Sequence, residues 1–524
     1  AYQLLYNLPV NQTVVLKATN AKSVYTYLHS EQKAIFNSKV TGGDIIHTEN
    51  HFNDFTVQSL LPNYLSRQGP CMAKADVNKD GREDLFIGGA KGSPGQLSIQ
   101  NAGGDFALSK QPDIIKDSLA EDVSAVFFDA NGDGYPDLYV GSGGYEFDET
   151  DILLQDRLYI NNGKGDFVKA GNALPQMLTS TGCVKAADID GDGDMDLFVG
   201  GRVVPGKYPM APESYILLND GGGKFTNAAS AIAPSVKNIG MVTDALWTDL
   251  NKDGKSDLII VGEWMPIKVF INTNGKLEDA SAKYIHFASS GWWNKILADD
   301  FDGDGDADII IGNLGANAQF RASQKEPLSI YYKDFDGNGS VDPIFCYYIN
   351  GVSYPAASRD DLMEQLPVLK KKFNNYSSYA NATIKDIFSP EQLKDAGLLS
   401  VEMLSTVYLQ NNGDSVFVMN SLPQEAQYAP VCAIASADVN KDGKKDIILA
   451  GNNAWTRIKF GRYRANHGIM LAGDGKGGFN YVPQYKSGLK LRGDVRSMDF
   501  IRVGNKDLLT VGMNNAALIS YSFD

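Results

Sequence analysis

The sequence of 524 residues lacks most of the patterns that mark a membrane protein or a metal-dependent hydrolase. No apolar run approaches the roughly 18 residues that a transmembrane helix requires, which argues against a membrane span. There are five histidines and no HxxxH or HExxH pattern, and neither a G-x-S-x-G elbow nor a P-loop occurs. The formal charge of −15 argues against a nucleic-acid surface and suits a protein that carries metal cations.

Cysteine is also scarce. The four cysteines are Cys71, Cys183, Cys346 and Cys432, and no two of them form a CxxC pair. A zinc site or a redox pair therefore has no support in the spacing. Each cysteine lies in an apolar, strand-like context, so we expect buried free thiols.

A nine-residue acidic motif is the most prominent feature that is present. The stretch "DIDGDGDMD" at 188–196 recurs at 76–84, 129–137, 249–257, 300–308, 334–342 and 438–446. All seven copies have Asp at positions 1 and 9, Asp or Asn at positions 3 and 5, and Gly at position 6. Short apolar runs that end in glycine, such as "LFVGG", follow every copy except the one at 334–342.

The spacing of the copies predicts the fold. Without the copy at 334–342, the first aspartates lie 53, 59, 61, 51 and 138 residues apart, and a degenerate copy at 499–507 follows after another 61. A period of 50–60 residues fits one four-stranded antiparallel sheet per repeat, as in "CVKAADI", "DLFVGG", "SYILLND" and "KFTNAA". We therefore predict an all-β, seven-bladed β-propeller. The alternative is eight blades, if the copy at 334–342 opens a blade of its own.

The interval of 138 residues indicates one blade with an insertion at about 325–403. The insertion holds the acidic loop 334–342, and helical segments are expected within about 358–398. "SRDDLMEQL" begins with a Ser358 cap, and "SPEQLKDAG" runs from Ser389 to Gly397. The last repeat lacks a fourth strand, and "KAIFNSKV" at 33–40 is expected to supply it and so to close the ring.

The acidic motif has the composition of a calcium loop. Calcium takes about six to eight oxygen ligands, and a nine-residue loop with a glycine at the sharp turn can supply them. An EF-hand is excluded because its twelfth position would need Glu, whereas Val199 stands there in the copy at 188–196, and strands flank the loop. Magnesium fits less well because it usually retains several waters. The degenerate copy keeps Asp499 and Asp507 but has Ile501 and Val503 at positions 3 and 5, so it should bind no ion.

We expect about seven structural Ca²⁺ ions and assign no catalytic residue. The expected ligands are positions 1, 3, 5, 7 and 9 of each loop, the seventh through its backbone carbonyl: Asp76, Asn78, Asp80, Arg82, Asp84, Asp129, Asn131, Asp133, Tyr135, Asp137, Asp188, Asp190, Asp192, Asp194, Asp196, Asp249, Asn251, Asp253, Lys255, Asp257, Asp300, Asp302, Asp304, Asp306, Asp308, Asp334, Asp336, Asn338, Ser340, Asp342, Asp438, Asn440, Asp442, Lys444 and Asp446.

These loops resemble the FG-GAP/VCBS repeats of integrin α-subunit propellers. Further stretches, among them "LSRQGPCMAKADVN", "GGRVVPGKYP", "GEWMP" and "SSGWWN", resemble bacterial surface proteins of the ASPIC/UnbV class, which are related to the cartilage acidic proteins. The resemblance implies that 1–24 are the C-terminal remnant of an upstream ASPIC/UnbV-like β module and that 25–524 are the propeller. It also implies a fragment of a longer protein, or part of a surface complex, at the cell surface or outside the cell, with the bacterial outer membrane surface as the expected place.

A binding role is expected for the loops opposite the calcium sites, because several of them are long and rich in arginine and aromatic residues. The candidate ligand-binding residues are Arg202, Tyr208, Trp264, Asn313, Arg321, Trp455, Arg457, Arg462 and Tyr463. The expected partner is an envelope or other extracellular protein, or a glycan, and not a nucleic acid. The leading interpretation is non-catalytic. The alternative is a carbohydrate-active enzyme such as a polysaccharide lyase, with Arg462 or Tyr463 near the channel mouth as the base.

Overall fold

The computed structural model describes residues 5, 11, 13–23, 33–39, 45–413 and 416–523. The chain divides into two compact units, Ala1–Ala34 and Ile35–Asp524. In the smaller unit the described part includes one short 3₁₀ helix, η1 (Ala18–Asn20). The N-terminal module expected at 1–24 lies partly outside the described residues. None of the described helices has the length and apolar character needed to span a bilayer.

Five sheets of the larger unit are meanders, in which four antiparallel strands follow one another along the chain. They are β2 (Met72–Ala75), β3 (Asp84–Ile87), β4 (Gln96–Gln100) and β5 (Phe106–Ser109); β6 (Asp122–Phe128), β7 (Asp137–Ser142), β8 (Arg157–Asn161) and β9 (Phe167–Lys169); β10 (Ser180–Ala187), β11 (Asp196–Val203), β12 (Tyr215–Asn219) and β13 (Phe225–Asn227); β14 (Met241–Thr248), β15 (Asp257–Met265), β16 (Lys268–Thr273) and β17 (Lys276–Asp279); and β27 (Val431–Ala437), β28 (Asp446–Gly451), β29 (Ile469–Gly473) and β30 (Phe479–Val482). The strands expected for the repeat that contains 188–196 are confirmed as β10 to β13.

Two further four-stranded sheets combine distant segments of the chain. One contains β19 (Lys295–Asp299), β20 (Asp308–Gly312), β25 (Val407–Gln410) and β26 (Val418–Ser421). The other contains β31 (Val495–Val503), β32 (Lys506–Met513), β33 (Ile519–Phe523) and, from the start of the unit, β1 (Phe36–Lys39). The expectation that 33–40 supplies the missing strand is confirmed, since β1 pairs antiparallel with β33.

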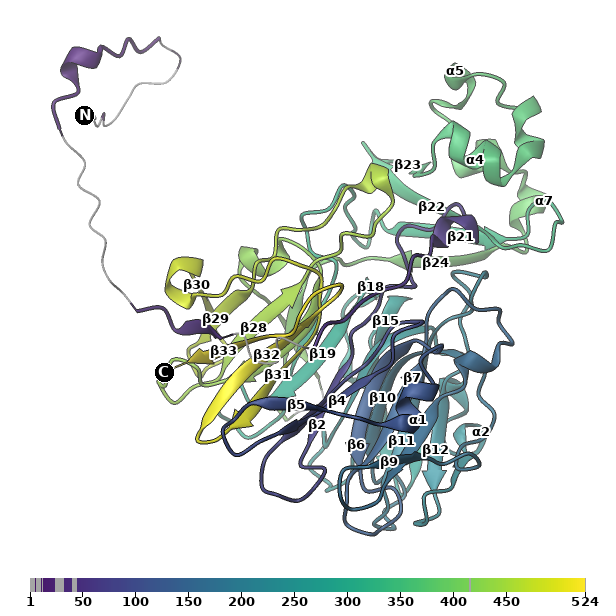
Figure 1. The fold of residues 1–524 in the computed structure, drawn as a ribbon. Helices are drawn as coiled ribbons and strands as arrows, with labels where there is room; N and C mark the ends of the chain where they lie inside the picture. Colours follow the sequence, from purple (N-terminus) through teal and green to yellow (C-terminus); the bar gives the residue numbers. More distant parts are fainter. Residues whose placement is uncertain are drawn as a thin grey trace. The chain divides into compact units, whose positions relative to one another are not determined.

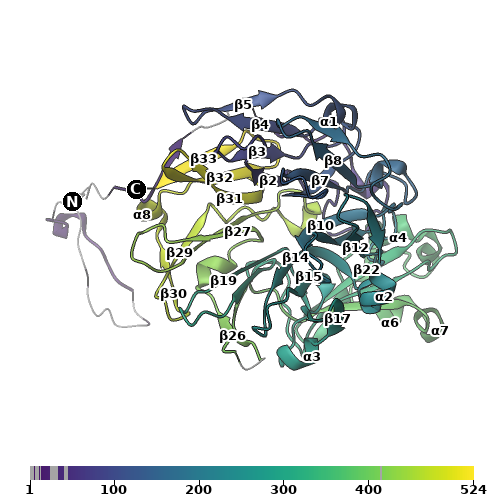
Figure 2. The ribbon, with the colours of Figure 1, turned by 90° about the horizontal axis from the view of Figure 1, so that it is seen from below.

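The first strands of these seven sheets contact one another in sequence order, β2 to β6, β10, β14, β19, β27 and β31, and β31 also contacts β2. Seen from below, the sheets surround a common centre (Figure 2). The second strands of six of these sheets have buried side chains throughout, because a sheet lies on either side of each. The arrangement is consistent with a β-propeller.

An eighth sheet lies within the insertion, between β20 and β25. Its strands are β21 (Leu328–Lys333), β22 (Asp342–Ile349), β23 (Val352–Pro355) and β24 (Gly397–Val401). The first strands of the ring do not contact it strongly, whereas β24 contacts β15 and the short strand β18 (Gly291–Trp292). Figure 1 shows this sheet, with its helices, above the ends of the ring sheets.

Short helices accompany the sheets. Outside the insertion they are η2 (Asp54–Thr56), α1 (Pro112–Lys116), η3 (Ile152–Leu154), α2 (Ala229–Ile232), η4 (Pro234–Val236), α3 (Ser281–Tyr284), η6 (Gln424–Gln427), η7 (Ile458–Phe460) and α8 (Gln484–Ser487). Inside it they are α4 (Arg359–Gln365), η5 (Pro367–Lys371), α5 (Tyr376–Tyr379), α6 (Ile384–Ile387) and α7 (Pro390–Leu393). The caps expected at Ser358 and Ser389 are present as capping boxes. Gly397, expected to end a helix, instead begins β24.

The four cysteines and two of the tryptophans are buried or half-buried. Cys71, Cys183 and Cys346 are buried free thiols, and Cys432 is half-buried and also free. Trp292 and Trp293 also belong to the core. Trp292 ends β18, which pairs with the outer end of β15, and the innermost strand β19 begins only at Lys295.

Candidate metal loops and binding face

Each acidic loop is held by its first aspartate. In the copy at 188–196, the carboxylate of Asp188 accepts hydrogen bonds from the backbone N–H of Gly191 at 2.7 Å and of Gly193 at 3.1 Å. Gly193 has φ = 98°, a left-handed conformation that strongly favours glycine. The glycine at position 6 has positive φ in all seven loops, so the turn expected from the sequence is confirmed.

The ninth aspartate closes the loop from inside the sheet. Asp196 is 1% exposed, and its carboxylate accepts from the backbone N–H of Ile189 at 3.0 Å and of Asn219 at 2.8 Å. Burial raises the pKa of Asp196 to about 6, although these donors lower it. The aspartate at position 9 therefore joins the start of the loop to the end of the third strand of the same sheet.

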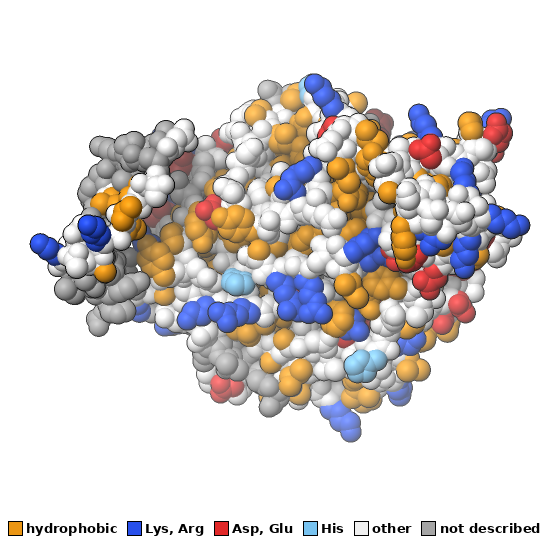
Figure 3. Space-filling model, turned by 90° about the horizontal axis from the view of Figure 1, so that it is seen from above, with side chains coloured by type: hydrophobic (Ala, Val, Ile, Leu, Met, Phe, Trp, Pro, Cys, Tyr) orange, Lys and Arg blue, Asp and Glu red, His pale blue; other side chains and the backbone are white. Residues whose placement is uncertain are grey.

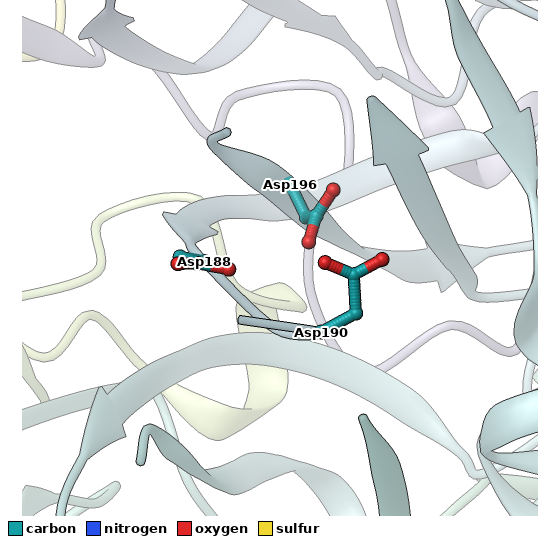
Figure 4. Close-up of side chains that lie close together, drawn as sticks. All are labelled: Asp188, Asp190 and Asp196. Atoms are coloured by element: carbon teal, nitrogen blue, oxygen red, sulfur yellow. The ribbon is translucent and has the colours of Figure 1, made fainter. Parts of the chain in front are cut away.

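Carboxylates converge in three loops. Oxygen atoms of Asp188, Asp190 and Asp196 lie within 4.8 Å of one another, and Figure 4 shows the three side chains around one point. Equivalent groups are Asp300, Asp302 and Asp304, and Asp334, Asp336 and Asp342. The other four loops have Asn at position 3, whose amide oxygen offers a neutral ligand in the same place. All-oxygen sites of this kind fit Ca²⁺, which prefers carboxylate, amide and carbonyl oxygens.

Neighbouring sheets are joined beside these loops by asparagines that the sequence analysis did not single out. Asn161, Asn219 and Asn272 each lie at or next to the end of a third strand. Each donates from Nδ2 to the carbonyl of the second loop residue in the preceding sheet, at 2.8, 2.9 and 2.8 Å respectively. The signal was present in the sequence as a recurring asparagine in "YINN", "LLND" and "FINT".

These asparagines are expected to contribute measurably to stability. Replacing Asn219 by Ala should lower the free energy of unfolding by about 1–3 kcal/mol, because the buried carbonyl of Ala130 loses its donor. Asn162→Ala is the matched control, since Asn162 is exposed in a hairpin and bonds only within it. Chemical denaturation of both variants measures the difference, and equal effects would contradict the role assigned to Asn219.

Position 4 of the loops is a second feature that the sequence analysis missed. It holds Gly in four loops and Lys in three, and all seven residues have positive φ, including Lys79 at 56° and Lys252 at 58°. Two of these lysines reach position 7 of the next loop. The Lys79 ammonium lies 3.9 Å from the ring centre of Tyr135, and Lys252 Nζ lies 2.5 Å from Asp306 Oδ1. The loops therefore contact one another around one face.

The degenerate copy at 499–507 keeps its strands but not its turn. Strands β31 and β32 continue to Val503 and from Lys506, and Arg502 pairs with Asp507 across a tight hairpin. Gly504 still has positive φ, at 59°. Ile501 is fully buried, and Asp499 lies 3.5 Å from Lys74 Nζ. With Ile501 and Val503 at the positions of oxygen ligands, this segment forms an ordinary β-hairpin in place of an acidic loop.

On the opposite face, three candidate ligand-binding residues come together, but inside the protein. Trp264 donates from Nε1 to Tyr208 Oη at 2.6 Å, and Tyr208 and Arg202 both donate to the carboxylate of Glu263. Tyr208 is 0% exposed and Trp264 3%. They belong to an apolar cluster with Phe345 of the inserted sheet, which packs on this part of the face. These side chains fix the loops and present little surface to a partner.

The remaining candidates separate into buried and exposed groups. Asn313 is fully buried and donates to the Met403 carbonyl. Arg321 donates to backbone carbonyls of its own turn, and Arg457 lies 2.8 Å from Asp361 of α4.

Trp455 is half-buried and stacks against a cationic side chain described below, and Arg462 is exposed. Tyr463 is 9% exposed, and burial raises its pKa to about 12. A general base at neutral pH would need a lowered pKa, so Tyr463 is poorly suited to that role.

An exposed basic groove adjoins these residues. It has a volume of about 360 Å³, and its lining includes Arg464, His467 and Arg492, with Trp455 at its wall. Arg464, His467 and Arg492 are exposed. Figure 3 shows Lys and Arg side chains gathered near the middle of this face, beside a histidine. Arg492 belongs to an "RGD" stretch, whose Asp494 is buried and accepts from the Ala454 N–H.

Comparison with known proteins agrees with the loop geometry. A family model described as an FG-GAP-like repeat matches residues 76–140, 149–199 and 249–311, which contain five of the seven acidic loops. These parts of the chain carry FG-GAP-like repeats. Cartilage acidic protein 1 of Xenopus tropicalis is 22% identical over 310 residues, which are 53% of this chain and 45% of that protein. The human protein of the same name is 22% identical over 313 residues, or 53% and 44% of the two chains.

The FG-GAP-repeat chain spans less than half the length of these relatives. A shorter similarity, 28% identity over 163 residues, covers 27% of this chain and 19% of the phosphatidylinositol-glycan-specific phospholipase D of Bos taurus. Among solved structures, YCF48 bound to D1 peptide aligns with 92% of this chain and 100% of that chain, at a TM-score of 0.41 and 10% identity. The V. cholerae biofilm matrix protein Bap1 aligns with 93% and 91% at a TM-score of 0.35 and 10% identity.

Proposed function

We propose that the protein is a calcium-stabilised, seven-bladed propeller whose loop face binds an acidic partner outside the cell, without catalysis. The contact of β31 with β2 after six other neighbour contacts supports a ring of seven blades. The insertion sheet is then an appendage to one blade. In its acidic loop at 334–342, Asp334 accepts from Gly337 and Gly339 and Asp342 accepts from Phe335, as at the matching positions of ring loops such as 188–196, so it is a calcium loop outside the ring.

The basic groove is the observation that carries the binding role. The chain has a formal charge of −15, yet Arg464, His467 and Arg492 line one exposed hollow on the face away from the acidic loops. Arginine and aromatic residues are typical of binding hot spots, and Trp455 stands at the same wall. An acidic segment of an extracellular protein is the partner that fits this charge best. Relatives called cartilage acidic protein and the FG-GAP-like repeats support an extracellular setting.

The groove gives a direct test with charge-reversal variants. We expect the calcium-loaded protein to bind poly-glutamate, measured by calorimetry, with an affinity that falls as salt is added. Arg464→Glu combined with Arg492→Glu should weaken binding by about tenfold or more, since rim charges of this kind act through long-range attraction. Lys164→Glu, at an exposed hairpin beside the acidic loops, should leave it unchanged.

Two outcomes would contradict the proposal. Preferred binding of a sulfated glycan over poly-glutamate would assign the groove to carbohydrate instead of protein. Turnover of an acidic polysaccharide, detected as new chain ends and lost in Arg462→Ala, would show an enzyme.

A further inference from the structure

A cavity in the central channel lies beneath the loop face. It has a volume of about 260 Å³ and is lined by residues of the innermost strands, among them Val123, Lys185 and Lys295. Since each of these strands runs from this end towards its acidic loop, the cavity lies at the end of the channel away from the metal loops. None of the side chains named as calcium ligands lines it.

Two segments from opposite ends of the unit roof the cavity. Tyr64 donates its backbone N–H to the Trp455 carbonyl at 2.8 Å, and Asn63 bridges to Thr456. The guanidinium of Arg67 lies 3.9 Å from the ring centre of Trp455, a cation–π contact that fixes this side chain under the roof. Trp455 therefore lines both this cavity and the exposed basic groove.

Hydrogen-bond donors in the lining lack partners among the described residues. Arg67 is 8% exposed and Arg202 7%, yet Arg67 Nε and Arg202 Nη1 are buried without an acceptor. Asn294 Nδ2 and the Ser497 hydroxyl in the same lining are also unpartnered. Buried polar groups are nearly always paired, and each lost partner costs about 1–3 kcal/mol. Three of these four atoms are N–H groups that can only donate, so what is missing is an acceptor.

The lining of the cavity carries more positive than negative side chains. Asp244 is shared between Lys185 at 2.9 Å and Lys295 at 3.0 Å, which leaves one positive charge. Arg202 is neutralised by Glu263, but Arg67 forms no ion pair within 4 Å among the described residues. Among the described residues, its side chain donates a hydrogen bond to the Asn50 carbonyl. The cavity is therefore basic inside an acidic protein.

An apolar compartment continues from the basic one. It measures about 60 Å³ and shares Arg202 and Asn294 with the cavity. Its other walls include Leu314, Phe320 and Phe460. A ligand with an anionic head between the unpartnered donors could therefore extend a short apolar arm among these side chains.

We propose that the channel binds a small organic carboxylate, with its carboxylate at Arg67, Arg202 and Asn294 and its apolar arm towards Phe320. Arginine pairs well with carboxylates because its planar fork donates two parallel hydrogen bonds. The site is independent of the groove proposed above, because it lies below the roof and uses other side chains.

Calorimetry on the calcium-loaded protein tests the site with four probes: phenylacetate, its neutral isostere phenylacetamide, acetate and phosphate. Phenylacetate should bind most tightly, and phenylacetamide should bind at least about tenfold more weakly, as expected for the loss of charge-assisted hydrogen bonds. Asn294→Asp, which places a carboxylate among the donors, should weaken phenylacetate by a similar factor. Lys164→Gln, which removes one positive charge outside the channel, should not.

Two further measurements keep the proposal falsifiable if a variant is unstable. In crystals of the unaltered protein soaked in bromide, anomalous density should appear beside Arg67 and Arg202. Density for water only, or phenylacetamide binding as tightly as phenylacetate, would overturn the proposal. Tighter binding of phosphate than of phenylacetate would overturn the assignment to carboxylates. Arg464→Glu with Arg492→Glu should leave phenylacetate binding intact, which distinguishes this site from the groove.

Discussion

Removing calcium is expected to lower the melting temperature by about 10 °C or more. Without an ion, carboxylates such as those of Asp188, Asp190 and Asp196 are held within 4.8 Å of one another and repel by roughly 1 kcal/mol or more per pair. Each ion bound at a hundred times its dissociation constant would contribute about 2.7 kcal/mol, and seven loops could bind together. Even half of that sum is a large fraction of the stability of a folded domain, which is about 5–15 kcal/mol.

Calorimetry with and without a chelator measures this shift, and elemental analysis of the dialysed protein should find about seven Ca²⁺ ions, one for each loop. Excess Ca²⁺ should restore the melting temperature, while equal Mg²⁺ should restore less because it gives up its waters reluctantly. Calcium should bind more weakly below about pH 6, because burial raises the pKa of Asp196 and its counterparts to about 6 and protons then compete. One ion or none per chain would contradict the assignment of the loops.

The loops could be predicted from the sequence because every determinant is local. Asp188 bonds to residues three and five positions ahead, and Asp196 bonds back to Ile189. The glycine at position 6 is required by its positive φ. A short segment therefore carries nearly all the information about its own conformation, and seven repetitions make the pattern secure.

The loop face could not be predicted in the same way, because its burial depends on distant segments. Tyr208 is hydrogen-bonded to Gln58 and Glu263, which lie far from it in the sequence. Phe345 of the insertion packs against Trp264 with ring centres 5.6 Å apart. The sequence of a long loop rich in arginine and aromatic residues does not show whether the folded protein leaves the loop exposed or covers it. Only the packing of the insertion decides that Arg464 and Arg492 remain exposed while Tyr208 and Trp264 do not.

Of the unpartnered channel donors, the sequence analysis named Arg202 as a ligand-binding candidate but missed Arg67 and Asn294 for a similar reason. Arg67, Arg202 and Asn294 come from three separate segments, and no motif links them. Their meeting depends on the ring, which brings the first residues of all the innermost strands to one axis. The sequence thus predicts the outside of the ring, where repeats are regular, better than its axis, where each repeat contributes a different residue.

Phe36 joins the two ends of the ring, so it is expected to have the largest effect of any single side chain in β1. Phe36 is 1% exposed, pairs with Phe523 in the register of β1 and β33, and packs edge-on against Tyr521 at 6.2 Å between ring centres. These contacts lie within one sheet whose strands come from opposite ends of the unit. No other described strand could replace β1 without leaving its own sheet.

Phe36→Ala should lower the free energy of unfolding by about 3–5 kcal/mol, as buried Phe→Ala changes do, whereas Asn37→Ala, at an exposed neighbour in the same strand, should change it little. Truncation gives a sharper comparison. A chain that begins at residue 34 keeps β1 and should remain stable, whereas one that begins at residue 40 leaves the edge of β33 unpaired and should unfold earlier and self-associate. Denaturation and light scattering measure both effects. Equal stability of the two truncated chains would show that β1 does not close the ring.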